Sequence, residues 1–178
     1  MESSNIWDQQ YSQGSWDVLK SEKENARQET ARQLIYKYAF NGTLLEVGCG
    51  EGLLQQHLNP DAYTFFTGVD FSAIAINRAA ALNDHKTSYI VADMEVYTPP
   101  HLIDLILFNE SIYYAKNPLD LLRRYMPFLR DNGVMMTSIF STGNNLKIIK
   151  QIHESFDIVD EIITSNERGS WYCTVFSK

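Results

Sequence analysis

Short runs of β-branched and aromatic residues alternate along this chain with segments whose apolar positions recur at helical spacing. The runs predict strands at residues 43–49, 64–70, 88–93, 103–109, 133–140, 158–164 and 171–177. Between them, residues 52–58, 72–82, 118–129 and 144–156 carry the pattern of one apolar helix face. Because the first five strands alternate with helices, the pattern predicts a mostly parallel sheet that is covered on both sides.

The last two predicted strands differ from the others in how they are connected. Only residues 165–170 separate them, which is the length of a hairpin connection and too short for a helical crossover. One of these two strands must therefore run antiparallel. The pattern as a whole predicts an α/β fold with seven strands and a closing C-terminal hairpin.

The first 40 residues lie outside this alternation. Residues 6–16 are aromatic and polar, and residues 21–40 are amphipathic with an apolar end at Leu34, Ile35 and Tyr38. We expect residues 1–40 to form an N-terminal segment and a helix that pack on the main domain, residues 41–178. The whole chain of 178 residues suits a single domain with its own core.

Composition and charge narrow the classes of function. The formal net charge of −7 argues against nucleic acid, because phosphate binding needs a surplus of lysine and arginine. No apolar run approaches the length of a membrane span, and the first residues do not resemble a signal peptide. Two distant cysteines favour a reduced, cytoplasmic protein, and the four histidines share no metal-ligand spacing. We therefore expect a cytoplasmic protein that uses no metal, membrane or nucleic acid.

The stretch LLEVGCGEG, residues 44–52, turns from the first predicted strand into the first helix. Glycines at positions 48, 50 and 52 allow a ligand to approach the backbone and the helix N-terminus. Dinucleotide enzymes favour G-x-G-x-x-G, and this spacing fails because Leu53 stands where that pattern continues. The acidic Glu46 favours a ligand with a cationic amine over a pyrophosphate. A tight turn without any ligand is the alternative.

Three further strands end in polar residues. In GVDFS, Asp70 can accept hydrogen bonds from both hydroxyl groups of a ribose, although it could instead cap the next helix. In VADM, Asp93 and Met94 suit the edge and the face of an adenine. The fourth strand ends at Asn109 in DLILFNES. Ligands of open α/β sheets bind at this carboxyl edge, so we expect one site there.

Taken together, LLEVGCGEG, GVDFS, VADM and DLILFNESIYY resemble the class I S-adenosylmethionine-dependent methyltransferases. The run ESIYY is similar to small-molecule N-methyltransferases of the nodulation-protein-S type. The resemblance implies a Rossmann-like, doubly wound sheet with strand order 3-2-1-4-5-7-6. It also implies S-adenosyl-L-methionine as cofactor, S-adenosyl-L-homocysteine as product, and in-line transfer of the methyl group to nitrogen or oxygen of a small-molecule, possibly carrier-bound, acceptor.

The resemblance implies roles for single residues as well. The glycine loop would pass the methionine part of the cofactor, Asp70 would hold the ribose, and Asn109 would lie near the sulfonium. Glu110 would face the acceptor as a catalytic residue, although it could instead orient an ammonium group or cap the next helix. Tyr113, the second catalytic candidate, and Tyr114 would line the acceptor pocket or belong to the core. Tyr11 and Trp16 would close over the site as a lid, or Trp16 would only pack in the core. The implied cofactor-binding residues are Tyr11, Glu46, Gly48, Cys49, Gly50, Gly52, Asp70, Phe71, Asp93, Met94 and Asn109.

Two departures from the family pattern leave the acceptor open. No N/D-P-P-Y/F motif follows the fourth strand, which argues against methylation of amides or of adenine N6. The chain also lacks a sizeable insertion that would cap the acceptor, so the site is open to a large acceptor or to completion by a partner subunit or a second copy. A protein-directed or partner-dependent methyltransferase and a non-catalytic cofactor-binding module are the alternatives. The glycine spacing disfavours a nicotinamide dehydrogenase.

Overall fold

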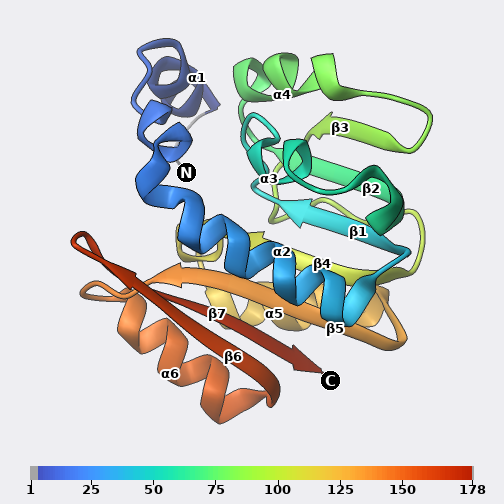
Figure 1. The fold of residues 1–178 in the computed structure, drawn as a ribbon, viewed down its shortest axis with the longest axis vertical. Coiled ribbons are helices and arrows are strands. Elements are labelled where there is room, and N and C mark those ends of the chain that lie inside the picture. Colours follow the sequence, from blue (N-terminus) through green and yellow to red (C-terminus); the bar gives the residue numbers. More distant parts are fainter. Residues whose placement is uncertain (1–3, 178) are drawn as a thin grey trace.

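A single seven-stranded sheet forms the centre of the computed structural model, which describes residues 4–177 (Figure 1). Its order is β3-β2-β1-β4-β5-β7-β6, and β1 to β5 pair in parallel while β7 is antiparallel to both β5 and β6. This confirms the predicted fold class and strand order. The terminal residues 1–3 and 178 of the two expected segments lie outside the described residues. The strands are β1 Gly42–Val47, β2 Tyr63–Asp70, β3 Thr87–Val91, β4 Ile103–Asn109, β5 Leu129–Phe140, β6 Asp157–Asn166 and β7 Gly169–Ser177.

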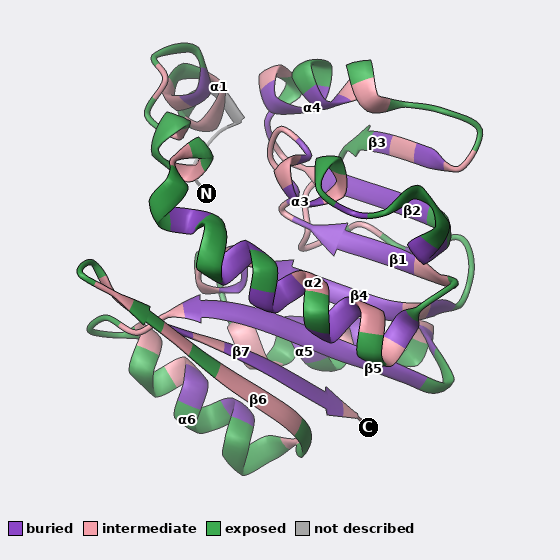
Figure 2. Ribbon diagram, in the orientation of Figure 1, coloured by how far each residue is buried: buried purple, intermediate pink, exposed green. Residues whose placement is uncertain are grey.

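Helices cover both faces of the sheet, because successive strand residues point to opposite sides. Leu44 packs with the helices α2, α3 and α4 on one face, and its neighbour Leu45 packs with α5 and α6 on the other. Figure 2 shows the inner strands buried along most of their length, with more exposure on the edge strands β3 and β6. The helices are α2 Asn25–Ala39, α3 Leu53–Gln56, α4 Ala73–Ala79, α5 Pro118–Tyr125 and α6 Asn145–Ser155.

The N-terminal segment contains a helix that the sequence pattern did not predict, α1 Ser4–Ser12. Two 3-10 turns, Asp17–Lys20 and Glu22–Glu24, connect it to α2. The carboxylate of Asp8 fixes α1 to the start of α4, where it accepts hydrogen bonds from Ser72 Oγ at 2.6 Å and from the Ile74 amide at 3.2 Å. This contact forms only in the folded chain, which explains why no local sequence pattern predicts the helix.

The closing hairpin is longer than predicted. β6 runs to Asn166 and β7 begins at Gly169, so the connection that the sequence assigned to residues 165–170 is nearly all paired strand. The hydroxyl groups of Ser165 and Ser170 lie 2.7 Å apart across the ribbon. Polar residues there suit a solvent-facing pair of strands as well as they suit a loop.

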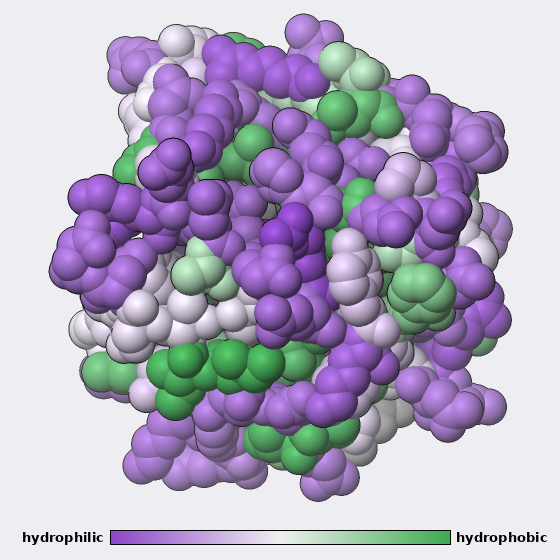
Figure 3. Space-filling view, in the orientation of Figure 1, coloured by the Kyte–Doolittle hydropathy of each residue, from purple (hydrophilic) through white to green (hydrophobic). Residues whose placement is uncertain are grey.

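The face in Figure 3 is largely hydrophilic, with apolar side chains gathered in its lower part, where Figure 1 places β6. Ile158, Val159 and Ile163 of this edge strand are 36%, 47% and 52% exposed. Within residues 4–177, no helix combines the length and the apolar character needed to cross a bilayer.

Candidate functional site

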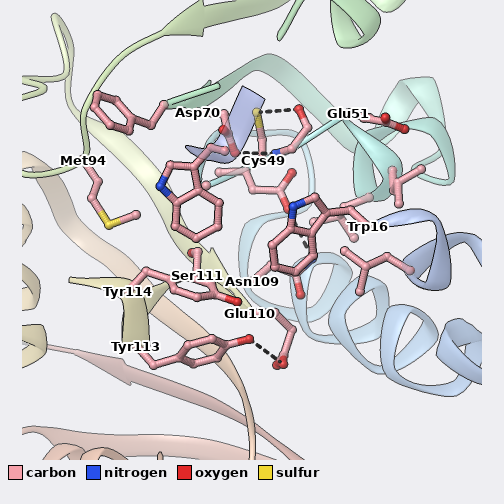
Figure 4. A pocket seen from close by; sticks show the side chains of 18 of the residues that line it. Trp16, Cys49, Glu51, Asp70, Met94, Asn109, Glu110, Ser111, Tyr113 and Tyr114 are labelled. Carbon is pink, nitrogen blue, oxygen red and sulfur yellow. Dashed lines mark hydrogen bonds between the residues drawn. The ribbon is translucent and has the colours of Figure 1, made fainter. Parts of the chain in front are cut away.

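A cavity of about 510 Å³ lies between the N-terminal segment and the carboxyl ends of the parallel strands (Figure 4). Parallel strands end at the same edge, so residues far apart in sequence meet there. Every site residue predicted from the sequence lines this cavity except Gly52. Those brought together are Tyr11, Glu46, Gly48, Cys49, Gly50, Asp70, Phe71, Asp93, Met94, Asn109, Glu110 and Tyr113.

The glycine loop is shaped by close neighbours as well as by backbone conformation. Gly48 and Gly50 have φ angles of +78° and +53°, which side chains rarely adopt. A Cβ atom on Gly48 would lie 2.4 Å from Ser111 Cβ, and one on Gly50 would lie 2.7 Å from Tyr11 Oη. Both positions therefore exclude a side chain and leave the backbone bare.

Gly52 has a different role from the predicted one. It precedes α3 with a φ angle of +74°, and a Cβ atom there would lie 2.5 Å from Tyr89 Oη. Tyr89 belongs to β3, so this glycine allows close packing against the sheet and does not border the cavity. Sequence spacing alone could not separate a packing glycine from a ligand-facing one.

Glu46 and Trp16 each carry a buried polar atom of the cavity wall that has no hydrogen-bond partner among the described residues, and in Glu46 this atom belongs to a carboxyl group. The side chain of Glu46 is only 3% exposed, and Oε1 accepts a hydrogen bond from Asn109 Nδ2 at 3.2 Å. Oε2 is buried without a hydrogen-bond partner among the described residues. Burial raises the pKa of Glu46 to about 8, although Asn109 and the Arg27 charge oppose the shift. A buried oxygen without a donor is costly, so a ligand's ammonium group would stabilise it.

Arg27 of α2 is a site residue that the sequence did not reveal. It is 3% exposed, its Nε donates to Glu24 Oε2 at 2.9 Å, and its Nη1 donates to Asn109 Oδ1 at 2.5 Å. Asn109 thus links the guanidinium of Arg27 to the carboxyl of Glu46 in the cavity wall. A carboxyl group and a guanidinium group held side by side suit the ammonium and the carboxylate of an amino acid. The charged start of α2 looks like an exposed face in sequence, and only tertiary packing buries it.

The glycine loop is tied to the end of β2 through Asp70. Its Oδ2 accepts from the Gly50 amide at 2.9 Å, and its Oδ1 accepts from the Ser72 amide at 2.8 Å. Burial raises the pKa of this carboxyl, and the backbone amides oppose the shift. Each oxygen keeps a lone pair for a ligand hydroxyl. Ser72, and not Asp70, caps α4, because Ser72 Oγ accepts from the Ala75 amide at 3.1 Å.

Asp93 and Met94 form another part of the cavity wall. Asp93 Oδ1 accepts from the Glu95 amide at 2.9 Å, and the Met94 carbonyl accepts from Tyr125 Oη at 3.1 Å and from Arg124 Nη1 at 3.3 Å. These bonds fix the loop after β3 and leave the thioether of Met94 directed into the cavity (Figure 4). The loop therefore offers a carboxylate and a soft apolar surface side by side.

Glu110 and Tyr113 meet on the side of the cavity that is bordered by the end of β4. Glu110 has a φ angle of +56°, an uncommon conformation for a residue other than glycine. Its Oε1 accepts from Ser138 Oγ at 3.0 Å and its Oε2 accepts from Tyr113 Oη at 3.1 Å. Burial raises the pKa of Glu110. The structure brings these two predicted residues into direct contact.

Aromatic rings of the N-terminal segment cover the cavity. Trp7 lies 5.9 Å from Trp16 and 4.9 Å from Tyr114, measured between ring centroids, and Tyr11 lies 6.1 Å from Trp16. Trp16 borders the cavity, so plain core packing does not describe its position. Trp7 was not predicted, because one tryptophan in a short polar stretch gives no sign of what it contacts.

Known proteins resemble this chain in sequence and in fold. A family model described as a methyltransferase domain matches residues 22–165, which is most of the chain. Malonyl-[acyl-carrier protein] O-methyltransferase 2 of Ilyobacter polytropus is 28% identical over 120 residues, which cover 66% of this chain and 45% of that protein. The chain spans less than half the length of the curated relatives it matches.

Two solved structures show the same fold at low sequence identity. The N-methyltransferase NodS of Bradyrhizobium japonicum WM9, in complex with S-adenosyl-L-homocysteine, has a TM-score of 0.77 at 18% identity and covers 90% of each chain. A putative methyltransferase in complex with the Haloferax volcanii Trm112 activator has a TM-score of 0.72 at 14% identity and covers 96% of each chain.

Proposed function

The chain belongs to the class I S-adenosylmethionine-dependent methyltransferases, and we propose that it moves the methyl group of S-adenosyl-L-methionine to nitrogen or oxygen of a small-molecule acceptor. The observation that carries this proposal is the unpartnered, buried Oε2 of Glu46 beside the glycine loop. It calls for a cationic group in a cavity that also offers the carboxylate of Asp70 for two hydroxyls. A sulfonium nucleoside with an amino-acid end meets both demands.

The residues of the cavity fit each part of that cofactor. Glu46 would accept from its ammonium group, and Arg27 would pair with its carboxylate, because both side chains border the cavity and share Asn109 as a partner. Asp70 would accept from the ribose hydroxyls. Asp93 would accept from the adenine amine, and Phe71 and Met94, which also line the cavity, would pack on the adenine rings.

The protein's part in the chemistry is geometric. The bound cofactor supplies an activated methyl group, so the side chains need to place an acceptor atom in line with it and exclude water. Orientation of this kind can contribute about 7–11 kcal/mol. We assign the exclusion of water to residues 1–40 as a lid, because Tyr11 lies against Gly50 and Trp16 borders the cavity.

The acceptor we propose is small, and a carrier can present it. The relatives include enzymes named for a malonyl group on acyl-carrier protein, for trans-aconitate and for tRNA U34. The net charge of −7 provides no surplus of cations for an RNA backbone, which favours a small or carrier-bound acceptor over RNA. We place the protein in the cytoplasm, since Cys49 and Cys173 are both free thiols.

A partner-dependent enzyme is the second candidate. The exposed apolar residues of the edge strand β6 and the fold shared with a protein bound to the Trm112 activator favour it. If this candidate holds, the isolated monomer binds the cofactor and transfers no methyl group until a partner subunit or a second copy is added.

Calorimetry and labelled-methyl transfer test the proposal together. We expect S-adenosyl-L-homocysteine to bind one site per chain and Glu46→Ala to weaken this binding, while Glu161→Ala, which removes a carboxylate of β6 outside the cavity, leaves it unchanged. Methyl label from S-adenosyl-L-methionine should then enter a metabolite extract. Failure to bind either nucleoside would refute the proposal. Binding without transfer would leave the partner-dependent enzyme, if an added partner restores transfer, or a cofactor-binding module, if it does not.

A further inference from the structure

Glu110 is held in a strained conformation with its carboxylate directed into the cavity. A φ angle of +56° costs a residue with a side chain on the order of 1–3 kcal/mol, and such strain gathers at functional sites. The Glu110 amide donates to the Ser138 carbonyl at 2.9 Å, while Ser138 Oγ and Tyr113 Oη donate to the two carboxylate oxygens. Three bonds therefore fix both the backbone and the head group of one residue.

The donors around Glu110 leave it able to take a further partner. Two hydroxyl groups occupy one lone pair on each oxygen, so each oxygen keeps another. Figure 4 shows the carboxylate next to the Tyr113 ring at the side of the cavity where Asn109 lies. Asn109 also bonds Glu46, so Glu110 lines the same cavity as the residues proposed to hold the amino-acid end of the cofactor.

Aromatic rings form another part of the wall of this compartment. Tyr113 and Tyr114 lie 4.6 Å apart, and Trp7 packs edge-on against Tyr114 at 4.9 Å. A carboxylate among aromatic rings attracts cations, because ring faces carry negative charge and the site is shielded from water. A cationic acceptor therefore gains more from this combination than a neutral one does.

The geometry points to an amine as the acceptor, and this inference rests on the proposed function: Glu110 binds the acceptor's ammonium group and takes one proton from it. The neutral nitrogen then has a free lone pair, which forms the new bond to the methyl carbon. The bond between that carbon and sulfur breaks, and its electron pair stays on sulfur. The product is a methylated ammonium ion beside a neutral thioether, and Glu110 returns its proton to solvent after release.

The charges around Glu110 support a role in proton transfer. Burial raises the pKa of its carboxyl above the ordinary range, Arg27 lowers it, and Glu24 raises it. Tyr113 from the loop after β4 and Cys173 from β7 are the other titratable groups that face it. A carboxylate with a raised pKa takes a proton from an ammonium more readily than an exposed one does.

Selective blocking of amines in a metabolite extract tests the acceptor class. One half of the extract is treated with sulfo-N-hydroxysuccinimidyl acetate, which acylates amines, and both halves receive labelled S-adenosyl-L-methionine and the enzyme. We expect label in the untreated half, stable to mild base, and at least tenfold less in the acylated half. Equal labelling of both halves, or label released as methanol by base, would overturn the amine assignment and leave the proposed function standing. No label in either half would refute the methyl transfer itself.

Variants at Glu110 test its part in the reaction. We expect Glu110→Gln to lose about 10²-fold or more in kcat/KM at pH 7, with the loss shrinking at higher pH where the free amine is already neutral. Glu110→Gly keeps a backbone suited to positive φ and should lose as much activity, which separates the carboxylate from the strain. Glu161→Gln, outside the cavity, should retain activity. A loss in Glu110→Gln that is equal at every pH, or full activity in Glu110→Gly, would contradict proton transfer to this residue.

Discussion

Replacing Glu46 by glutamine should make the stability of the cofactor-free protein less sensitive to pH. The substitution keeps the size of the side chain and its acceptor for Asn109, and it removes the ionisable group. Burial raises the pKa of Glu46 from the ordinary value of 4.5 to about 8 in the folded protein. Between these values the folded protein keeps a proton that the unfolded chain has lost, so rising pH favours unfolding.

The size of this effect follows from the pKa difference. Each unit corresponds to about 1.4 kcal/mol, so the carboxyl should remove on the order of 5 kcal/mol of stability between pH 4.5 and 8. Above pH 8 the cost is complete and no longer grows. Glu46→Gln has no such window, so its free energy of unfolding should rise relative to the natural chain across that range.

Cofactor binding should reverse the same shift. An ammonium group next to Glu46 stabilises its ionised form, so binding of S-adenosyl-L-homocysteine at pH 7 should release a proton from this carboxyl. The association constant should rise about tenfold per pH unit between pH 6 and 7 and level off above 8. In Glu46→Gln the affinity should be lower and nearly independent of pH in this range.

Urea unfolding at pH 5.5, 7 and 8.5, with Glu161→Gln as the control, measures the first effect. Calorimetry in two buffers of different ionisation enthalpy counts the protons released on binding. Parallel stability curves for the natural chain and Glu46→Gln, together with binding that moves no proton, would refute the account of Glu46 as a buried acid awaiting a cation.

Three further perturbations test other parts of the site. Asp70→Ala should lose about 1–3 kcal/mol of affinity for S-adenosyl-L-homocysteine in calorimetry, since its bonds to ribose hydroxyls are charge-assisted, and unchanged affinity would mean that the ribose is held elsewhere. Gly48→Ala should lower the melting temperature more than Gly143→Ala, because both have positive φ but only the first places a Cβ against a neighbour, at 2.4 Å; equal losses would contradict the clash. Asp8→Ala removes the contact of α1 with the start of α4, so limited proteolysis should cut the N-terminal segment faster and cofactor affinity should fall; cleavage at the rate of the natural chain would show that α1 is held by other contacts.

Local patterns were sufficient for the sheet and for most of its site. The bounds of β4 agree with the prediction from residues 103–109, because a buried parallel strand is an uninterrupted apolar run between polar ends. The same logic located the cavity: once the strands are parallel, the residues that follow β1, β2, β3 and β4 meet at one edge without any further information. Asp70 and Asn109 could be found in this way.

Contacts between segments that are far apart in the chain could not be predicted from local sequence patterns. Arg27 belongs to a helix whose charged start looks solvent-exposed, and it is buried where its guanidinium donates to Asn109 at the end of β4. Helix α1 depends on the contact between Asp8 and Ser72, which are far apart in the chain. Gly52 has the same spacing as its neighbours but packs against Tyr89. In each case the deciding partner is distant in sequence.

The buried charged residues of the cavity wall are better explained by their role in orienting the groups proposed to bind the cofactor than by a contribution to the stability of the fold. Arg168, at the turn of the closing hairpin, donates to Glu24, which also pairs with Arg27, and Arg27 reaches Glu46 through Asn109. Burying such ions costs desolvation that their attraction barely repays, and well-packed apolar side chains would often be as stable. Apolar side chains could not supply a carboxyl group and a guanidinium group in fixed positions at the glycine loop. The network therefore joins the hairpin that borders the acceptor compartment to the groups proposed to hold the cofactor, and its geometry sets the distance between the two.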